Sequence, residues 1–270
     1  MTPPDILLRI AERRRQRVAE AGPLDPLALA EGRPLTPADN RFLAALTARR
    51  GTPAIPAVPA IIAEVKMGSP RLGSLHGRVD PTAQARLYAA HGTAALSVVV
   101  EPDFFHGSYD LLAACIAVSG LPAIAKDFVV DPVQLVWARE AGADAVLLIA
   151  ALHEASELAR YARLARGLGL VPLIETHDAD DIAKLGGEPW ELVGINNRNL
   201  RTFDVDLQSS ISLLPGLPAE AAKVAESGIR DCLDVLLLQE SGFDAFLIGE
   251  SLLLAADPAA KLRELLGPEA

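Results

Sequence analysis

The chain has 270 residues, of which 50% are hydrophobic and 22% are charged, and its formal net charge at pH 7 is −10. This balance excludes an intrinsically disordered chain, which needs fewer apolar residues. The negative charge, together with only 4% aromatic residues, argues against a nucleic-acid-binding protein.

Several features place the chain in a reducing compartment and away from membranes. Cys115 and Cys232 lie far apart without a Cys-x-x-Cys motif, so we expect neither a disulfide framework nor a structural zinc site. The N-terminal residues lack the apolar segment of a signal peptide. The longest apolar run, residues 145–152, has eight residues, whereas a membrane span needs ~18 or more. We therefore expect a soluble, cytoplasmic protein.

The first predicted element is an amphipathic helix over residues 5–21. Asp5 can cap its start. One apolar stripe is indicated by Ile6, Ile10 and Val18. The arginines at 13–15 are interpreted as a solvated helix face, because acidic residues flank them. Residues 22–60 are rich in Pro and Gly and hold one short helical stretch near 39–49. We expect residues 1–60 to form a helical extension that packs on the domain that follows.

A regular alternation of short apolar runs and Ala-rich helical stretches fills residues 61–270. The runs are 61–66, 95–100, 122–126, 145–149, 171–175, 192–196, 222–226 and 245–248. A run begins about every 26 residues, close to the ~30 residues of a βα unit. Continuously apolar strands indicate a parallel sheet covered by helices. The pattern predicts the α/β class, with a single (β/α)8 TIM barrel, and one domain in all.

Polar side chains gather at the ends of these predicted strands. They are Glu64, Lys66, Glu101, Lys126, Glu175, Asn196, Asn197, Glu226, Ser227, Gly249 and Glu250. A charge at the end of a buried strand is costly unless it is paired or faces a wet cleft. Because the carboxyl ends of barrel strands form one rim, where active sites are built, we interpret this set as an active site.

Two lysines and two glutamates of this set form a candidate acid–base group. Lys66 and Lys126 would face Glu64 and Glu175 across the mouth of the barrel. In a desolvated pocket the pKa of a lysine can fall well below ~10.4, and that of a carboxylic acid can rise, so both types could work near neutral pH. A lysine can also form a Schiff base with a ketone. The residues by themselves leave both roles open.

The loops after the last two strands indicate a phosphate site. Small residues at 226–229 and 249–252 allow backbone N–H groups to approach an anion. Lys66, Lys126 and Arg198 would add a local positive field despite the negative net charge. The five histidines show no metal-ligand spacing, and no Gly-x-Gly-x-x-Gly motif follows a strand. We therefore expect no metal and no dinucleotide cofactor.

Several motifs in order give the chain a family resemblance from about residue 5 to the C-terminus. They are IAEVK (62–66), GSP (68–70), FFHGS (104–108), KDFVVDP (126–132), PLIETH (172–177), GINNRNL (194–200), AESGI (225–229) and IGESL (248–252). The chain resembles the indole-3-glycerol phosphate synthase family. The resemblance implies a lyase of tryptophan biosynthesis that needs no cofactor. Its substrate would be 1-(2-carboxyphenylamino)-1-deoxy-D-ribulose 5-phosphate, which is closed, decarboxylated and dehydrated to indole-3-glycerol phosphate.

The resemblance also implies roles for individual residues. Lys126 would be the general acid, and Glu175 the partner base or the stabiliser of a cationic intermediate. Glu64 and Lys66 would orient each other, and Lys66 would contact the substrate carboxylate. The catalytic network and the substrate hydroxyls would be held by Asn196, Glu226 and Ser227. Phosphate would be held by Ser69, Gly228, Gly249 and the backbone of Glu250. The pocket for the aromatic ring would be shaped by Phe104 and Phe105.

Three further expectations concern partners and alternatives. The binding partner would be a small anionic molecule with a carboxylate and a sugar phosphate, and other tryptophan-pathway enzymes are candidate partners. One alternative is an isomerase of phosphoribosyl-amine sugars on the same barrel, although that reaction does not need two rim lysines and two strand-end glutamates. A second alternative is a non-catalytic barrel that serves as a binding or assembly partner.

Overall fold

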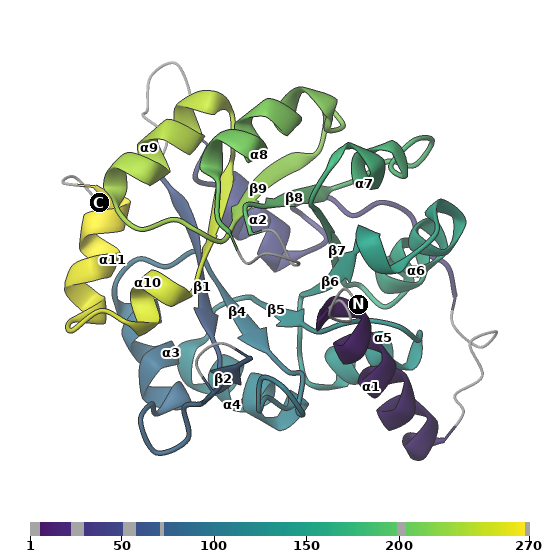
Figure 1. Ribbon diagram of the computed structural model, residues 1–270, viewed down its shortest axis with the longest axis horizontal. Coiled ribbons are helices and arrows are strands. Elements are labelled where there is room, and N and C mark those ends of the chain that lie inside the picture. Colours follow the sequence, from purple (N-terminus) through teal and green to yellow (C-terminus); the bar gives the residue numbers. More distant parts are fainter. Residues whose placement is uncertain (1–5, 23–29, 51–57, 71–72, 199–203, 268–270) are drawn as a thin grey trace, which may run out of the picture.

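The computed structural model describes residues 6–22, 30–50, 58–70, 73–198 and 204–267. Across these residues eight parallel strands close into a barrel with helices between them, as predicted (Figure 1). The barrel strands are β1 Ala60–Val65, β4 Ala95–Val99, β5 Ala123–Lys126, β6 Ala145–Ile149, β7 Val171–Thr176, β8 Leu192–Asn196, β9 Ala222–Glu226 and β10 Ala245–Ile248. The first and last of them, β1 and β10, pair and close the ring. Asp5 and residues 199–200, which carried sequence expectations, lie outside the described residues.

The strands match the predicted apolar runs to within one or two residues. Lys66 and Val100 lie one residue beyond the strand ends at which they were expected. The parallel register places successive strand ends at the same level: Ile149 lies opposite Glu175, and Asn196 lies opposite Glu226. The polar residues that end the strands therefore share one rim.

Helices follow the strands and cover the barrel from outside. They are α3 Pro81–Ala90, α4 Tyr109–Ser119, α5 Val133–Glu140, α6 Ala155–Gly167, α7 Ala179–Ala183, α8 Leu207–Leu213, α9 Cys232–Ser241, α10 Glu250–Leu253 and α11 Pro258–Leu266. Short elements complete the loops: β2 Gly68–Ser69, β3 Gly73–Ser74, η2 Ala150–Leu152 and η3 Leu214–Gly216. Several helices start at an aspartate that accepts backbone N–H bonds in the first turn, as Asp80 does for α3 and Asp257 for α11. Proline follows each of these two caps at the first helical position, where its missing N–H costs nothing.

Strand alternation creates two hydrophobic cores. Side chains such as Ile61 and Leu96 point outward and pack under the helices. The neighbouring positions, such as Ile62 and Leu173, point inward and fill the barrel. Both sets are fully or almost fully buried, which explains why the strand sequences are continuously apolar.

Two helices of the N-terminal segment, α1 Ile6–Ala21 and α2 Arg41–Thr47, contact opposite ends of the barrel. In Figure 1, α1 lies toward the viewer and α2 lies behind the strands. Phe42, Leu43 and Leu46 of α2 belong to the inner core. Asn40, the N-cap of α2, donates to the carbonyl of Asp144, just before β6, so α2 closes the amino ends of the strands.

One arginine of α1 corrects the sequence interpretation of residues 13–15. Arg13 and Arg15 are partly or well exposed, but only 5% of the Arg14 side chain is exposed. Arg14 forms a two-pronged ion pair with Asp127, with the shortest nitrogen–oxygen distance 2.6 Å. An arginine is tolerated in this interior because a carboxylate neutralises it. The helix face at Arg14 is therefore an interface, not a solvated surface.

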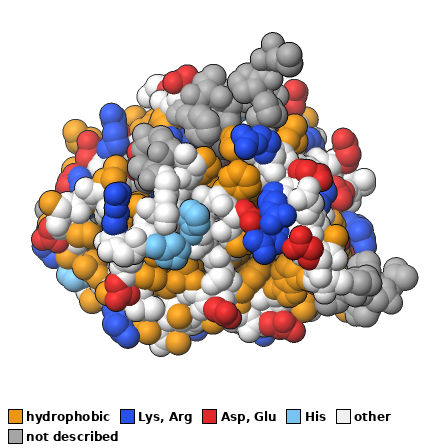
Figure 2. Space-filling model, turned by 60° about the horizontal axis from the view of Figure 1, so that its bottom comes forward, with side chains coloured by type: hydrophobic (Ala, Val, Ile, Leu, Met, Phe, Trp, Pro, Cys, Tyr) orange, Lys and Arg blue, Asp and Glu red, His pale blue; other side chains and the backbone are white. Residues whose placement is uncertain are grey.

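The outer surface carries both signs of charge. Acidic and basic side chains lie interspersed among exposed hydrophobic ones over the face seen in Figure 2. Among the described residues, no helix is long and apolar enough to cross a membrane.

Candidate active site

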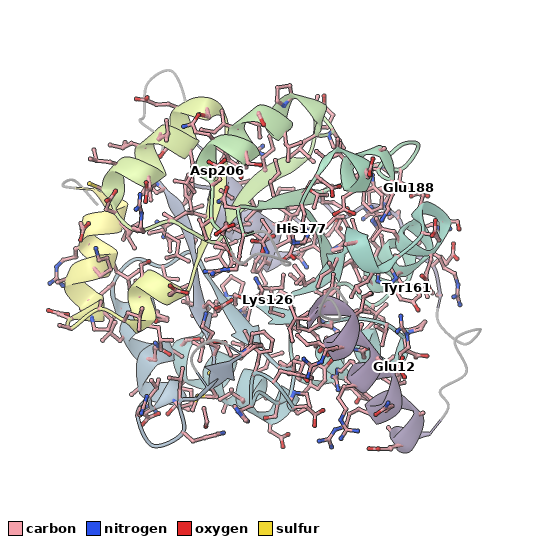
Figure 3. The ribbon with its side chains drawn as sticks, in the orientation of Figure 1. Glu12, Lys126, Tyr161, His177, Glu188 and Asp206 are labelled. Carbon is pink, nitrogen blue, oxygen red and sulfur yellow. The ribbon has the colours of Figure 1, made fainter. Side chains whose placement is uncertain are left out.

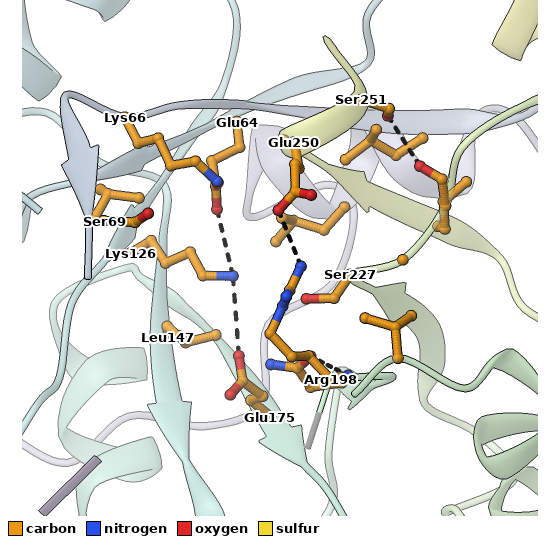
Figure 4. A pocket seen from close by; sticks show the side chains of 18 of the residues that line it. Glu64, Lys66, Ser69, Lys126, Leu147, Glu175, Arg198, Ser227, Glu250 and Ser251 are labelled. Atoms are coloured by element: carbon orange, nitrogen blue, oxygen red, sulfur yellow. Dashed lines mark hydrogen bonds and ion pairs between the residues drawn. The ribbon is translucent and has the colours of Figure 1, made fainter. Parts of the chain in front are cut away.

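A cavity of about 850 Å³ lies at the carboxyl ends of the strands. Its polar lining includes Glu64, Lys66, Ser69, Lys126, Glu175, Asn196, Arg198, Ser227, Gly228, Gly249 and Glu250. These are residues that the sequence assigned to the site, and they come from six different strand ends. Figure 4 shows their side chains converging from opposite sides of the mouth.

Lys126, the last residue of β5, is the centre of the charged cluster. Its Nζ lies 3.2 Å from Oε2 of Glu226, 3.7 Å from Oε2 of Glu64 and 3.9 Å from Oε2 of Glu175. Burial lowers the pKa of this amine, but the three carboxylates outweigh burial and raise it well above its ordinary value. The expectation of a lysine pKa below the ordinary range is therefore wrong for Lys126, because the desolvated pocket is strongly anionic. The amine stays protonated near neutral pH.

Glu64 and Lys66 form a pair on the β1 side of the cavity. Lys66 Nζ donates to Glu64 Oε1 at 2.7 Å. Burial would raise the pKa of Glu64, but the charges of Lys66 and Lys126 hold it below its ordinary value. Gly249 lies directly against this carboxylate: a Cβ at that position would stand 2.3 Å from Glu64 Oε1. Glycine is therefore required there by close approach.

Glu175 and Glu226 flank Lys126 from the other side, and their pKa values are shifted in opposite directions. Burial together with the charge of Glu175 raises the pKa of Glu226, against the opposing effect of Lys126. Burial would also raise the pKa of Glu175, but its contact with His177 and the charge of Lys126 lower it below the ordinary value. Two neighbouring carboxylates with pKa values pushed apart form a set in which one can hold a proton while the other is an anion.

Apolar side chains form one wall of the cavity. They are Ile6, Leu7 and Ile10 from α1, Phe105 and Phe128 from loops, and Leu147 and Ile149 from β6. The rings of Phe105 and Phe128 lie 5.8 Å apart, measured between centroids. Such a surface suits an aromatic ring. Of the two phenylalanines predicted for this wall, only Phe105 is among the lining residues.

The β4–α4 loop explains where Phe104 and Glu101 lie instead. Glu101 is fully buried, and its carboxylate accepts the backbone N–H groups of Asp103, Phe104 and Phe105 at 2.7–3.0 Å. Glu101 therefore shapes this loop and does not line the cavity, although its place at a strand end counted as a rim position in the sequence. Phe104 takes part through its backbone.

The opposite side of the cavity has the features of an anion site. Ser227 and Gly228 have φ angles of 66° and 78°; the left-handed region is uncommon for serine. Asn197 holds this turn by donating from Nδ2 to the carbonyls of Glu226 and Ser227 at 2.9 and 2.8 Å. A Cβ on Gly228 would stand 2.1 Å from Val205 Cγ1, so only glycine fits. The turn thus presents backbone to the cavity.

Arg198 and Glu250 add charge to this corner. An Arg198 guanidinium nitrogen lies 3.2 Å from Glu250 Oε2, as Figure 4 shows. Glu250 therefore offsets the positive charge that Arg198 was expected to add to the phosphate site. Gly249 caps α10 without a side-chain hydrogen bond, so the first N–H groups of that helix depend on other acceptors.

Sequence reasoning missed three contributors to the site. Asp127, which lines the cavity just after β5, and its ion-pair partner Arg14 were assigned no role in the site. His177 was noted only as a histidine beyond a strand end, yet its Nε2 lies 3.3 Å from Glu175 Oε1. Figure 3 places His177 and Lys126 near the centre of the barrel. The described residues contain no group of three or more His, Cys, Asp or Glu side chains arranged to hold a metal ion.

Comparison with known proteins gives consistent relatives. The family model described as indole-3-glycerol phosphate synthase matches residues 7–265. A protein of that name from Azoarcus sp. strain BH72 is 42% identical over 266 residues, which cover 97% of this chain and 99% of that protein. A protein of the same name from Laribacter hongkongensis is 40% identical over 263 residues, with 97% and 98% covered.

Solved structures support the fold. The 3-hexulose-6-phosphate synthase of Salmonella typhimurium has a TM-score of 0.61 at 14% identity, covering 76% of this chain and 96% of that one. The thiamine phosphate pyrophosphorylase of Pyrococcus furiosus has a TM-score of 0.53, also at 14% identity, with 77% and 93% covered. At this identity the likeness concerns the barrel alone.

Proposed function

Because this chain belongs to the indole-3-glycerol phosphate synthase family, we propose that it catalyses the closing step to the indole ring in tryptophan biosynthesis. The substrate is 1-(2-carboxyphenylamino)-1-deoxy-D-ribulose 5-phosphate. The products are indole-3-glycerol phosphate, CO2 and water, so the enzyme is a carboxy-lyase. The observation that carries the proposal is the position of the Lys126 amine among three carboxyl groups, between an apolar wall and an anion corner.

The cavity fits the parts of this substrate. The aromatic ring would lie against the apolar wall beside Phe105 and Phe128, and the phosphate would lie at the turn of Ser227 and Gly228. Ser69 and the backbone at Gly249 and Glu250 complete the phosphate side in this proposal. Anchoring both ends holds the ribulose ketone close to the aromatic carbon that attacks it. Such positioning can supply several kcal/mol toward the barrier.

Ring closure needs an acid at the ketone. The raised pKa of Lys126 keeps its amine protonated, and a protonated amine donates a proton but does not form a Schiff base. We therefore assign Lys126 as the general acid that protonates the ketone oxygen while the ring carbon attacks. The new C–C bond takes the electron pair of the ring, and the intermediate is cationic.

The carboxylates then stabilise this cation. Glu64 and Glu175 are anions at neutral pH in this cluster, and their charges are fixed before the reaction starts. Loss of CO2 returns the electron pair to the ring. Lys66 would contact the substrate carboxylate until it leaves. Asn196, Glu226 and Ser227 would hold the hydroxyls and the proton network.

Dehydration completes the indole. The hydroxyl formed from the ketone leaves with a proton as water, and a carboxylate, for which Glu175 is the candidate, takes a proton from the neighbouring ring CH2 carbon, so that the C=C bond of the new ring forms and the N–H is kept. No electrons are gained or lost overall, so the atoms balance without an oxidant or a cofactor. We also propose that the protein works in the cytoplasm as one domain and that its partner is this anionic small molecule.

The test is direct. Incubation with the carboxyphenylamino substrate should generate indole fluorescence and release CO2. Lys126→Ala should lower kcat by several orders of magnitude with an unchanged circular dichroism spectrum. Lys223→Ala is the matched control, because Lys223 belongs to β9 near its amino end and its Nζ donates to backbone carbonyls outside the cavity. A fully active Lys126→Ala enzyme would show that the acid is another group.

A further inference from the structure

His177 lies immediately behind the cavity, between two acidic side chains. It follows the last residue of β7, and only 14% of its side chain is exposed. Nε2 lies 3.3 Å from Oε1 of Glu175, and Nδ1 lies 3.4 Å from Oδ2 of Asp181. Each nitrogen of the ring therefore lies within ion-pair distance of its own carboxylate, although neither contact has hydrogen-bond geometry. An ion pair on both sides requires both nitrogens to carry a proton.

Helix α7 fixes the far side of this arrangement. The Asp181 carboxylate accepts the backbone N–H of His177 at 3.1 Å, and Asp178 caps the helix by accepting the N–H of Asp181. Lys184 Nζ lies 3.2 Å from Asp181 Oδ1 and donates to the carbonyl of Ala150 at 2.7 Å. Asp181, in the first turn of α7, therefore contacts both the backbone N–H and the ring of His177.

The charges alternate from the outside of the barrel to its mouth. When both ring nitrogens of His177 are protonated, Lys184, His177 and Lys126 are the positive members and Asp181 and Glu175 the negative ones, with neighbouring groups 3.2–3.9 Å apart. Alternation makes every contact attractive, so each group favours the charged form of the next.

We propose that His177 is a positioning residue that acts as a fixed imidazolium: it keeps Glu175 ionised and turned toward Lys126. This rests on the proposed function, in which Glu175 must be an anion when the cationic intermediate forms. His177 does not touch the reacting atoms in this scheme. It acts on the reaction only through the charge and the direction of the Glu175 carboxylate.

Besides His177, Glu175 is stabilised as an anion by Lys126 and by a hydrogen bond with Asn196, of which only Lys126 is charged. Lys126 from β5 lies 3.9 Å from Glu175 and attracts its negative charge. Glu226 from β9 is a second acidic group, and its charge and that of Glu175 repel each other. The 3-10 helix η2, which packs against β7 and α7, contains no ionisable side chain. Without the imidazolium, Glu175 and Glu226 would compete for the single amine of Lys126.

Burial by itself would lower the pKa of His177, but its contacts with Asp181 and Glu175 raise it to about 10. The ring should therefore remain doubly protonated through the pH range in which the enzyme works. This value agrees with the geometry, in which two carboxylates face one ring.

Nitrogen-15 NMR of the histidine rings tests the charge directly and requires no activity. The chain has five histidines, and the signals that disappear in His177→Asn identify this ring. We expect two protonated ring nitrogens from pH 6 to pH 9. A ring that titrates near the ordinary value of ~6.5, or that carries a single proton at pH 8, would overturn the proposal.

Kinetics test the role. In His177→Asn the pKa of Glu175 should rise, so the acid limb of the kcat profile should move to higher pH, and kcat at neutral pH should fall at least tenfold while KM changes much less. His153→Asn is the matched control, because His153 is also buried and pairs with a glutamate four residues on, Glu157, at 3.0 Å. The control should keep the acid limb of wild type.

The outcomes separate the two proposals. An inactive wild-type enzyme would refute the proposed function, while the ring spectra would still decide the state of His177. An active wild type whose acid limb does not move in His177→Asn would refute the role of His177. If His177→Asn does not fold, Asp181→Asn provides the second variant: the ring remains, loses one anion, and should give a smaller shift of the limb in the same direction, and no shift would refute the role.

Discussion

The buried ion pair between α1 and the end of β5 makes a quantitative prediction. Arg14 contacts Asp127 through Nε at 3.0 Å and Nη2 at 2.6 Å, and Asp127 is 1% exposed. Asp127 also accepts Tyr109 Oη at 2.7 Å, Gln134 Nε2 at 2.9 Å and the Phe128 N–H at 2.9 Å. Replacing Arg14 by Met keeps the unbranched apolar stem but removes the guanidinium and leaves the carboxylate without a cation.

Removal of one partner from a buried pair costs about 3–5 kcal/mol. Asp127 keeps three hydrogen-bond donors after Arg14→Met, so the lower end, about 3 kcal/mol, applies. This free energy is lost from the contact between α1 and the barrel, because the other partners of Asp127 all belong to the barrel domain. At ~1.4 kcal/mol for each factor of ten, α1 should open roughly a hundred times more often.

Amide hydrogen exchange in α1 measures this opening. The control is Arg15→Met: half of the Arg15 side chain is exposed, and its ion pair with Glu12 is 3.5 Å long. Exposed pairs contribute about 0–1 kcal/mol, so its exchange rates should change no more than about fivefold. Adding Asp127→Asn to Arg14→Met should recover part of the protection, since the orphaned charge is removed. Equal exchange rates in the two single variants would refute the reasoning.

Two further changes test the geometry of the cavity. Gly249→Ala should displace the Glu64 carboxylate, which lies 2.3 Å from the new Cβ, and lower kcat/KM about tenfold to a hundredfold; Gly186→Ala, with its nearest contact at 4.0 Å, should match wild type in the same assay, and equal kinetics for both would contradict the close approach. Asn197→Ala should release the left-handed turn at Ser227, lower the free energy of unfolding in urea by about 1–3 kcal/mol and raise KM for the phosphate substrate; an unchanged KM would separate this turn from the phosphate site.

The fold could be predicted because its signals are local. Each barrel strand is buried on both faces, so its sequence is continuously apolar, and the interval between strands is nearly constant. The convergence of Lys126 with Glu64 and Glu175 also followed from topology, since parallel strands in a closed barrel end at one rim.

Pairings between distant segments could not be predicted in the same way. Arg14 stands four residues after Ile10 and four before Val18, so the stripe that indicated a buried face already passed through it. The stripe alone did not name a partner, and an arginine without a partner is normally solvated. Asp127 lies 113 residues away.

The prediction of a lowered pKa for Lys126 was wrong for a related reason. Desolvation and neighbouring charge act in opposite directions on a lysine. The sequence reveals that the pocket is buried but not that three carboxylates lie within 4 Å of one amine. Only distances decide which effect wins.

The ion pairs that hold α1 against the barrel have a consequence for synthesis on the ribosome. Its charged anchors, Asp103 and Asp127, and the rings beside Arg14, Tyr109 and Trp137, all lie within the first 137 residues of the polypeptide. Closing the barrel needs β10, which lies more than a hundred residues later in the chain. The nascent chain therefore already contains the ionic partners that the described residues provide for α1 long before the barrel can close.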